Sequence, residues 1–303
     1  MSIVTLLGSL EIGLIFAIMS LGIYITFNIL NFPDLTVDGS FTLGCVVSAI
    51  LAFNGHPILG IFIATICGAL AGFVTGFLHT KMKVQYILAG ILTMTALYSI
   101  NLRIGGGKPN FSLFGKDTIF SLFKEFLETI GLTAFLPQYK LILIIIIAII
   151  CIIILYFFFK TQTGMAIRAT GDNEKMVRAS SINTDAMKML GLAIANAFVA
   201  LSASIFTQYQ IFYDISLGIG MMVVGLTSII LGQTIFGKKS ILISFISLTL
   251  GSVLYRILLS FALSLGMDPN DWKLMCALLV AAAISIPVIK AYLVKRREEY
   301  AED

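Results

Sequence analysis

The sequence predicts an all-α fold, a polytopic transmembrane helix bundle with about 8–9 spans. Of its 303 residues, 58% are hydrophobic and only 12% are Asp, Glu, Lys or Arg. A soluble domain carries about 25% charged residues, so this chain has too few charges to cover a surface in water. Its apolar residues also gather in long uncharged runs. These observations exclude a disordered chain and argue against a nucleic-acid-binding protein or a cytosolic enzyme.

The uncharged runs give the order of the expected spans along the chain. We expect them near residues 8–30, 40–54, 57–79, 84–103, 139–159, 188–211, 218–237, 241–265 and 273–294. The second is short for a full crossing and could be a half-helix. Little sequence is left for a soluble domain, so residues 1–303 are interpreted as a single transmembrane domain embedded in the lipid bilayer.

Basic residues orient the bundle, because cytoplasmic loops are enriched in Lys and Arg. Four basic clusters fall on one side if every span after the third crosses: residues 81–83, 160–188, 238–239 and 295–297. That side is expected to be cytoplasmic, which places the C-terminus in the cytoplasm. If all nine spans cross, the N-terminus lies outside. If the second span does not cross, the N-terminus lies inside.

The segment of about residues 104–138 is expected on the opposite, extracytoplasmic side. Five of its apolar residues follow helical spacing: Ile119, Phe123, Phe126, Leu127 and Ile130. Asp117 can cap the start of this helix and Gly131 its end. The pattern is typical of an amphipathic helix lying on the membrane surface, and a helix that plugs the outer mouth of the bundle is the alternative.

Two short segments far apart in the chain resemble each other. Residues 32–37 read Phe-Pro-Asp-Leu-Thr-Val, and residues 212–217 read Phe-Tyr-Asp-Ile-Ser-Leu. On the nine-crossing topology they lie on opposite sides of the membrane. That is the pattern of an inverted repeat, in which broken helices meet near the midplane and form the substrate path. Two ordinary capped helix starts with a chance similarity are the alternative.

Charged residues within apolar runs identify a candidate path. A charge at the membrane centre costs at least ~2.5–3.5 kcal/mol on insertion scales, so such residues usually face the protein interior. Arg256 is the clearest example, and it is expected to pair with a carboxylate of the repeated segments or to contact an anionic substrate group. A purely structural pair between helices is the alternative. The predicted substrate path comprises Asp34, Thr36, Asp38, Asp214, Ser216 and Arg256.

The sequence offers no recognisable catalytic chemistry. Its four cysteines and two histidines have no metal-ligand or nucleophile spacing, so we expect no catalytic residue and no metal site. Residues 232–239 match a P-loop except at Lys239, but they close a membrane helix instead of joining a strand to a helix. We therefore expect no cofactor and no ATP site in this chain.

The stretch of about residues 161–188 is the long polar segment on the expected cytoplasmic side. Asp172 or Asn173 can cap a short helix that runs to about Ser180, with Glu174 in its first turn. Such a helix is too short to be stable alone, so a partner surface would have to hold it. A plain loop is the alternative.

Two segments carry a resemblance to a known family. The first reads Thr163-Gly164-x-Ala166-x-Arg168-Ala169-x-Gly171-Asp172-Asn173-Glu174, followed by Ala179 and Ile182-Asn183; the second is residues 30–40, LNFPDLTVDGS. They resemble the coupling loop and the region after the first core helix of ATP-binding-cassette (ABC) importer permeases of the branched-chain amino acid and ribose type. The subgroup that looks most similar takes up amino acids, including aromatic ones. Ser181 departs from the pattern, because the family commonly has Gly there.

The resemblance implies a permease subunit of an ATP-driven importer that moves a small solute, an amino acid, inward by alternating access. It implies an ATP-binding subunit holding ATP-Mg, an extracytoplasmic substrate-binding protein, and a second permease copy in a homodimer or heterodimer. The residues implied in coupling to the ATPase are Gly171, Asp172, Asn173, Glu174, Lys175, Arg178 and Ile182. An ion-gradient-driven secondary transporter is the alternative, since broken helices and intramembrane carboxylates fit it too.

Overall fold

A computed structural model describes residues 3–237 and 240–266, together with residues 274–275, 277–278, 281 and 285. Seven described helices are long and apolar enough to cross a membrane. They are α1 (Ile3–Tyr24) with its π-helical continuation η1 (Ile25–Ile29), α2 (Thr36–Phe53), α3 (Pro57–Thr80), α4 (Tyr86–Ile104), α6 (Tyr139–Phe158), α9 (Thr184–Gln210) and α11 (Ile241–Ser264). The all-α membrane bundle is therefore confirmed.

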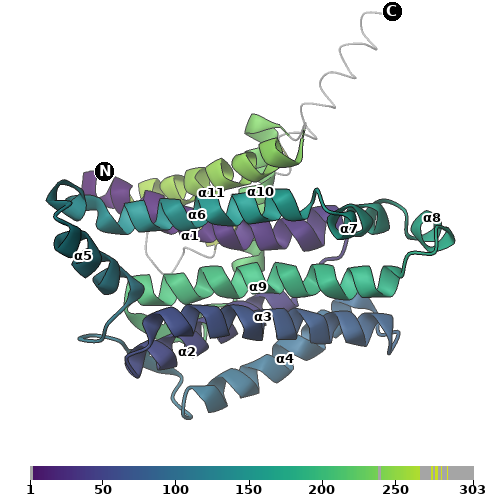
Figure 1. Cartoon of the computed structure of the whole chain (residues 1–303), viewed down its shortest axis with the longest axis horizontal. Coiled ribbons are helices and arrows are strands. Elements are labelled where there is room, and N and C mark those ends of the chain that lie inside the picture. The colour runs from purple at the N-terminus through teal and green to yellow at the C-terminus, as the bar shows by residue number, and fades with distance from the viewer. Residues whose placement is uncertain are drawn as a thin grey trace, which may run out of the picture.

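The remaining elements are short and lie mainly at the two ends of the bundle. They are β1 (Asn110–Ser112), α5 (Ile119–Ile130), η2 (Thr133–Gln138), α7 (Gln162–Asp172), α8 (Glu174–Ala179), β2 (Phe212–Asp214) and α10 (Met221–Phe236). Figure 1 shows α5 at one end and α7 and α8 at the other. We call these the α5 end and the α8 end.

The helix that is too short to cross a membrane is not the one that the sequence predicted to be short. The second expected span, α2, has 18 residues and is long enough to qualify as a crossing. The seventh, α10, has only 16. At 1.5 Å per residue α10 is about 24 Å long, which is less than the ~30 Å hydrocarbon core of a bilayer. The ninth expected span, residues 273–294, falls largely outside the described residues.

Helix α9 forms the centre of the bundle and packs against α1, α2 and α3. Glycines permit the closest approach: a side chain at Gly68 or Gly72 of α3 would overlap the backbone of α9. Small residues at helix interfaces are how membrane helices pack without a hydrophobic driving force between them. The core of the bundle is therefore fixed by backbone contact along α3 and α9.

Two of the basic clusters lie at the same end of the bundle, as the sequence predicted. Helix α1 begins at the α5 end (Figure 1). The Lys81 ammonium lies 3.9 Å from the Asp185 carboxylate, which joins the end of α3 to the start of α9. Residues 81–83 and 160–188 therefore share the α8 end, whereas residues 238–239 and 295–297 lie outside the described residues.

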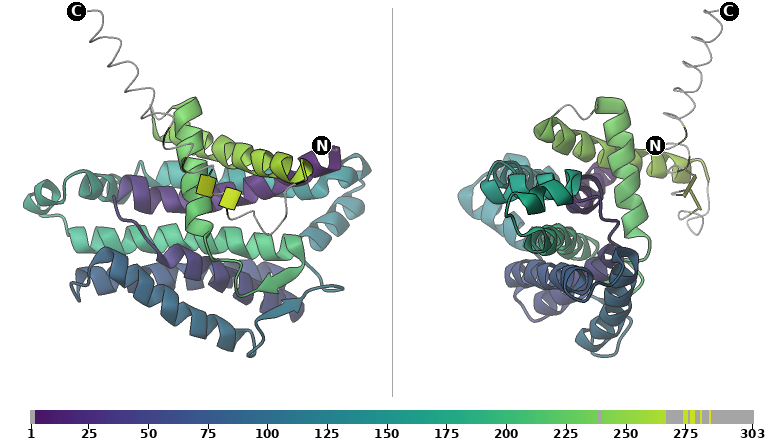
Figure 2. Two further views of the ribbon diagram at one scale, coloured as in Figure 1. Left: turned by 180° about the vertical axis from the view of Figure 1, so that it is seen from behind. Right: turned by 90° about the vertical axis from the view of Figure 1, so that its right-hand side faces the viewer.

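Two segments interrupt the regular crossing pattern. After η1 the chain turns at residues 30–35 and enters α2. After α9 it forms β2, which pairs with β1 at the α5 end, and residues 215–220 then lead back into the bundle. Helix α10 begins there and runs across the long helices (Figure 2). Both interruptions coincide with the two repeated segments of the sequence.

Helix α5 differs in detail from the prediction. Thr118, and not Asp117, caps its start, because the Thr118 hydroxyl oxygen accepts from Ser121 N. Gly131 ends it in the left-handed conformation, as expected. Phe120 and Leu127 are buried, while Phe126 and Ile130 are exposed. The apolar surface of α5 is therefore divided between the bundle and its surroundings.

Candidate functional site

The first repeated segment forms a buried turn that starts α2. Asp34 is 1% exposed, and its Oδ1 accepts from Thr36 N at 2.9 Å. Its Oδ2 accepts from Nδ2 of Asn196, near the middle of α9, at 2.7 Å. These bonds hold the start of α2 inside the bundle. The described contacts of Asp34 are thus those of a structural anchor.

Threonine hydroxyls extend this anchor to two further helices. The Thr36 and Thr75 hydroxyl oxygens lie 2.7 Å apart, and the Thr75 hydroxyl donates to Thr93 at 2.9 Å. All three residues are buried. Because Thr75 lies on α3 and Thr93 on α4, the chain of hydrogen bonds joins three helices beside the Asp34 turn.

The second repeated segment forms the same turn at the opposite end of the bundle. Ser216 N donates to Asp214 Oδ1 at 2.7 Å, as Thr36 N does to Asp34. The Ser216 hydroxyl also bonds to Asp214. Phe212, which begins this segment, pairs with Ser112 at the α5 end, whereas the Asn31 side chain beside the first segment donates to Gly171 O at the α8 end. The two copies are therefore inverted in position, but only the first is deeply buried.

Asp38 connects the two interrupted regions. Its Oδ2 accepts from Gly220 N at 2.8 Å, and its Oδ1 accepts from Met222 N at 2.9 Å. These N–H groups lie at the start of α10, where intrahelical acceptors are absent and the helix dipole favours a negative charge. A side chain of α2 thus caps α10 within the bundle.

Arg256 faces the helix α1 from its position on α11. It is on α11, which packs against α1 and α10, and its guanidinium carbon is 5.5 Å from the Phe16 ring centroid. One contact of Arg256 is therefore a cation–π contact with α1. Nearer the start of α1, the Tyr209 hydroxyl donates to Glu11 Oε2 at 2.6 Å.

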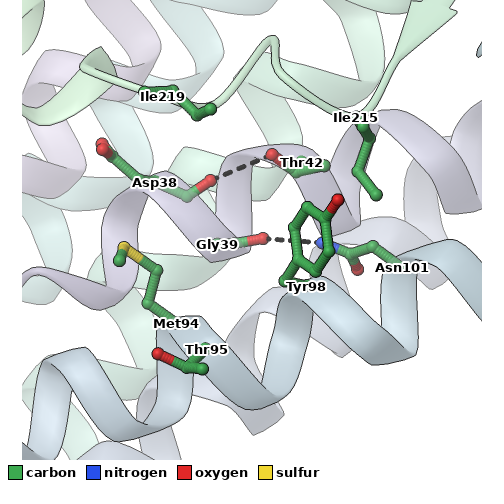
Figure 3. A pocket seen from close by; sticks show the side chains of 9 residues that line it. All are labelled: Asp38, Gly39, Thr42, Met94, Thr95, Tyr98, Asn101, Ile215 and Ile219. Carbon is green, nitrogen blue, oxygen red and sulfur yellow. Dashed lines mark hydrogen bonds between the residues drawn. The ribbon is translucent and has the colours of Figure 1, made fainter. Parts of the chain in front are cut away.

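A cavity of about 370 Å³ lies between α2, α4 and the loop before α10. Its lining consists of Asp38, Gly39, Thr42, Met94, Thr95, Tyr98, Asn101, Ile215 and Ile219 (Figure 3). Gly218 allows the loop to lie directly against α2, because a side chain there would overlap Asp38 O and the Thr42 hydroxyl. Of the six predicted path residues, Asp38 lines this cavity.

The predicted coupling loop folds as two helices that meet at Asn173. The Asn173 side chain caps α8 by accepting from Met176 N at 3.1 Å. Asp172 ends α7, and Ile182 lies half-buried after α8. Lys175 and Met176 are exposed on the surface of α8. Met176 is a candidate contact that the sequence motif did not single out, although it lies inside that motif.

Ion pairs fix α8 against the start of α9. Glu174 accepts from Lys188 Nζ at 2.7 Å and from Arg178 at 3.0 Å, and Arg178 also donates to Asp185 at 3.2 Å. The Lys188 hydrogen bond, the largest cause, lowers the pKa of the Glu174 carboxyl below its ordinary value. The negative charge of Glu174 is therefore part of what positions α8.

Gly171 joins this region to the membrane helices. A side chain at Gly171 would overlap the carbonyl oxygen of Ile29 at the end of η1. The Asn31 side chain donates to Gly171 O at 3.1 Å. Helix α7 therefore lies directly against the turn that leads to Asp34.

Together these features define a class of protein. Membrane-crossing helices line a cavity, and the short helix α10 begins beside it. The exposed helix α8 lies at one end of the bundle and is connected through α7 to the turn before α2. This is the architecture of a membrane transporter. Residues 5–284 match the family described as the permease component of branched-chain amino acid transport systems. The chain belongs to this family of ABC importer permeases.

Individual relatives agree with the family match. The chain is 40% identical over 274 residues to the tyrosine transport system permease protein of Clostridioides difficile (strain R20291), covering 90% of this chain and 88% of that protein. It is 24% identical over 226 residues to the ribose import permease protein of Haemophilus influenzae, covering 74% and 64% respectively. It is 26% identical over 227 residues to the autoinducer 2 import system permease protein of Yersinia pestis, covering 74% and 60%. No solved structure matches the chain.

The family membership establishes the general role. The chain is a multi-pass inner-membrane permease subunit of an ATP-driven importer for small solutes, and it is not an enzyme. ATP hydrolysis belongs to a separate ATP-binding subunit, and a substrate-binding protein is the other implied partner. This decides against the alternative of an ion-gradient-driven transporter.

Proposed function

We infer that the transported solute is an amino acid, which the permease moves inward by alternating access. The observation that carries this inference is the 40% identity to a tyrosine transport permease along 90% of the chain. The test is reconstitution with the cognate ATP-binding subunit and binding protein, followed by a screen of amino acids, sugars and nucleosides for stimulation of ATP hydrolysis. Stimulation by sugars or nucleosides alone would contradict the inference.

The α8 end is cytoplasmic, and the α5 end faces the binding protein. Two basic clusters at the α8 end support this orientation, as does the loop at that end that resembles a coupling loop. The basic residues 295–297 support a cytoplasmic C-terminus as well, since cytoplasmic segments are enriched in Lys and Arg. Single cysteines at the exposed residues Ser180 and Thr129 test the assignment in a cysteine-free variant. An impermeant thiol reagent added outside intact cells should modify T129C and spare S180C; the reverse pattern would overturn the orientation.

Helix α8 is the docking site for the ATP-binding subunit, which holds ATP-Mg. The exposed Lys175 and Met176 support this role, because they lie on a short helix inside the segment that resembles the family's coupling loop. Replacing both residues by Ala should reduce co-purification of the ATP-binding subunit. Lys108→Ala, at an exposed position between α4 and β1, is the control and should leave co-purification unchanged. Equal retention in both variants would contradict this docking.

The permease acts as a homodimer whose two copies share the translocation path. Family membership supports a second permease copy. Co-expression of two differently tagged copies tests the assembly. Co-purification of both tags with one pair of ATP-binding subunits is expected, and recovery of single-tag complexes only would overturn it.

A further inference from the structure

One side of α5 exposes apolar side chains, and we call it the apolar flank of α5. It is formed by Phe126, which is 57% exposed, and Ile130, which is 54% exposed. The two residues are four positions apart, so they lie one above the other on the same side of the helix. Phe120 and Leu127 of the same helix are buried. Packing of α5 against the bundle therefore leaves the apolar flank to the surroundings.

Helix α5 is held firmly, so its apolar flank has a fixed position. The Gln208 side chain on α9 accepts from Ile119 N, the first N–H of α5, at 2.7 Å. The Phe120 ring meets the Tyr209 ring edge-on, with the ring centroids 5.8 Å apart. Both ends of α5 are capped. The apolar flank cannot turn into the bundle without breaking these contacts.

Helix α6 fixes the level of α5 relative to the bilayer. With 20 residues α6 is about 30 Å long, which matches the ~30 Å hydrocarbon core. Its first residue, Tyr139, therefore lies at the boundary between hydrocarbon and headgroups, where Tyr side chains are enriched. Helix α5 packs against α6 and runs obliquely across the end of the bundle beside the start of α6 (Figure 1). Helix α5 thus lies at the same boundary.

The exposed surface of α6 shows what covers the molecule next to α5. Among the seven described crossing helices α6 is the most apolar, and residues 141–159 contain no charged residue. Ile146, Ile150 and Ile154 form an exposed stripe along it. Such a surface on a membrane-crossing helix faces lipid. Leu132, in the short connection from α5 to α6, is also exposed. The lipid-facing surface therefore continues from α6 to the apolar flank of α5.

The polar residues of α5 point in other directions. Successive helical residues turn by about 100°, so residues two positions apart point in nearly opposite directions. Glu128 is therefore opposite Ile130, and it pairs with Lys124 at 3.7 Å. Thr129 is opposite the buried Leu127 and faces away from the bundle, toward water. A helix with this pattern lies in the membrane surface, with its apolar side in the boundary between headgroups and acyl chains.

We propose that the apolar flank of α5 is inserted into the bilayer surface, where Phe126 and Ile130 contact phospholipid at the level of the glycerol groups and the first acyl carbons. Helix α5 is then a surface anchor, which holds the end of the central helix α9 on its buried side and lipid on its apolar flank. The occupant of this flank is lipid. The inference does not depend on which solute is transported or on which end of the bundle is cytoplasmic.

Spin labels at single cysteines test this contact. The permease with its ATP-binding subunit, all native cysteines replaced, is labelled at F126C or I130C and reconstituted into phosphatidylethanolamine–phosphatidylglycerol liposomes. Power saturation measures collisions with oxygen, which concentrates in lipid, and with a water-soluble nickel chelate. The oxygen-to-nickel ratio should exceed that of E128C, the matched control on the opposite side of α5, by about threefold or more. It should stay below the ratio of I149C in the middle of α6.

Three other results would overturn the proposal. A ratio equal to that of E128C would place the apolar flank in water. Few collisions with either probe would mean that a second permease copy covers it. Loss of both kinds of collision only after the substrate-binding protein is added would assign the flank to that protein.

A variant that keeps an aromatic ring gives a second readout if the cysteine variants fail to assemble. Relative to the unsubstituted complex, the additional fluorescence of F126W should be quenched by phospholipid brominated near the headgroup end of its acyl chains. Iodide in the surrounding water should quench it little. Quenching by iodide without quenching by the brominated lipid would overturn the proposal.

Discussion

Asp38 caps a helix that begins 182 residues later in the chain, through the bond from Gly220 N to its Oδ2. The same carboxylate accepts from Met222 N through Oδ1. One side chain of α2 thus holds the start of the discontinuous helix α10, beside the cavity. A change in the position of α2 therefore alters both the cavity wall and the capping of α10.

Loss of this cap should destabilise the permease. Asp38→Ala removes both acceptors, and removal of a helix cap costs about 0.5–2 kcal/mol. Asp38→Asn keeps one carbonyl oxygen and should cost less. The measurement is the thermal unfolding of the purified permease. Asp117→Ala is the matched control, because Thr118 and not Asp117 caps α5. An Asp38→Ala variant that unfolds at the wild-type temperature would contradict the capping role.

The Asp34 anchor should depend on Asn196. Asn196→Ala removes the donor to a carboxylate that is 1% exposed, and a buried polar group left unpaired costs about 1–3 kcal/mol. Asn196→Asp should be more harmful, since it places a second carboxyl group beside Asp34. Thermal unfolding measures both effects, with Asn54→Ala in an exposed turn as the control. If all three variants match the wild type, Asp34 is not held through α9.

The sequence predicted the contacts between neighbouring residues in these sites. It could not predict the contacts between residues far apart in the chain. Asp34 and Asp214 each bind the N–H two residues ahead, so the Asp-x-Thr/Ser pattern was enough to indicate both turns. Asp38 stood out as a charge in an apolar run, but its partners are on α10. Only the folded chain brings Gly220 to it.

The uncharged residues that line the cavity could not be predicted from the sequence either. Thr42 and Asn101 lie in apolar runs without charge, so a search guided by charge does not select them. Gly218 gave a weak signal, since a glycine between apolar residues can mark close backbone approach. The role of Arg256 was equally undetermined, because its contact with Phe16 depends on how α11 packs against α1.

Gly171 should tolerate no side chain. In Gly171→Ala the new methyl group would overlap Ile29 O and come within 2.9 Å of Leu30 Cα, so α7 must move away from η1. We expect a lower yield of assembled importer, or loss of substrate-stimulated ATP hydrolysis in what assembles. Gly8→Ala adds the same methyl group at a position whose nearest neighbour, the Tyr209 hydroxyl, is 4.0 Å away. Normal assembly and stimulation in Gly171→Ala would show that this contact does not transmit coupling.

The ion pairs of α8 should weaken in acid. The Glu174 pKa lies below its ordinary value of 4.5 in the folded protein because of the Lys188 hydrogen bond. A lowered pKa means that the stabilisation is present above the ordinary value and is lost as the pH falls through the folded one. The difference in thermal unfolding between wild type and Glu174→Gln should therefore be present near neutral pH and disappear in acid. Glu125→Gln on α5 is the control, and a difference that does not change with pH would contradict the assignment.

Ser181 occupies a backbone conformation that favours glycine. Its φ is 62°, whereas that of Ser180 is −83°. The left-handed region costs a residue with a side chain about 1–2 kcal/mol, and glycine avoids this cost but loses more chain entropy on folding. Ser181→Gly should therefore stabilise the end of α8 by a net amount of about 0.5–1 kcal/mol. Resistance of residues 174–188 to proteolysis measures the effect. Ser180→Gly is the matched control and should give no gain, because its φ suits any residue. An equal gain in both variants would mean that chain flexibility, and not the conformation of Ser181, determines how α8 ends.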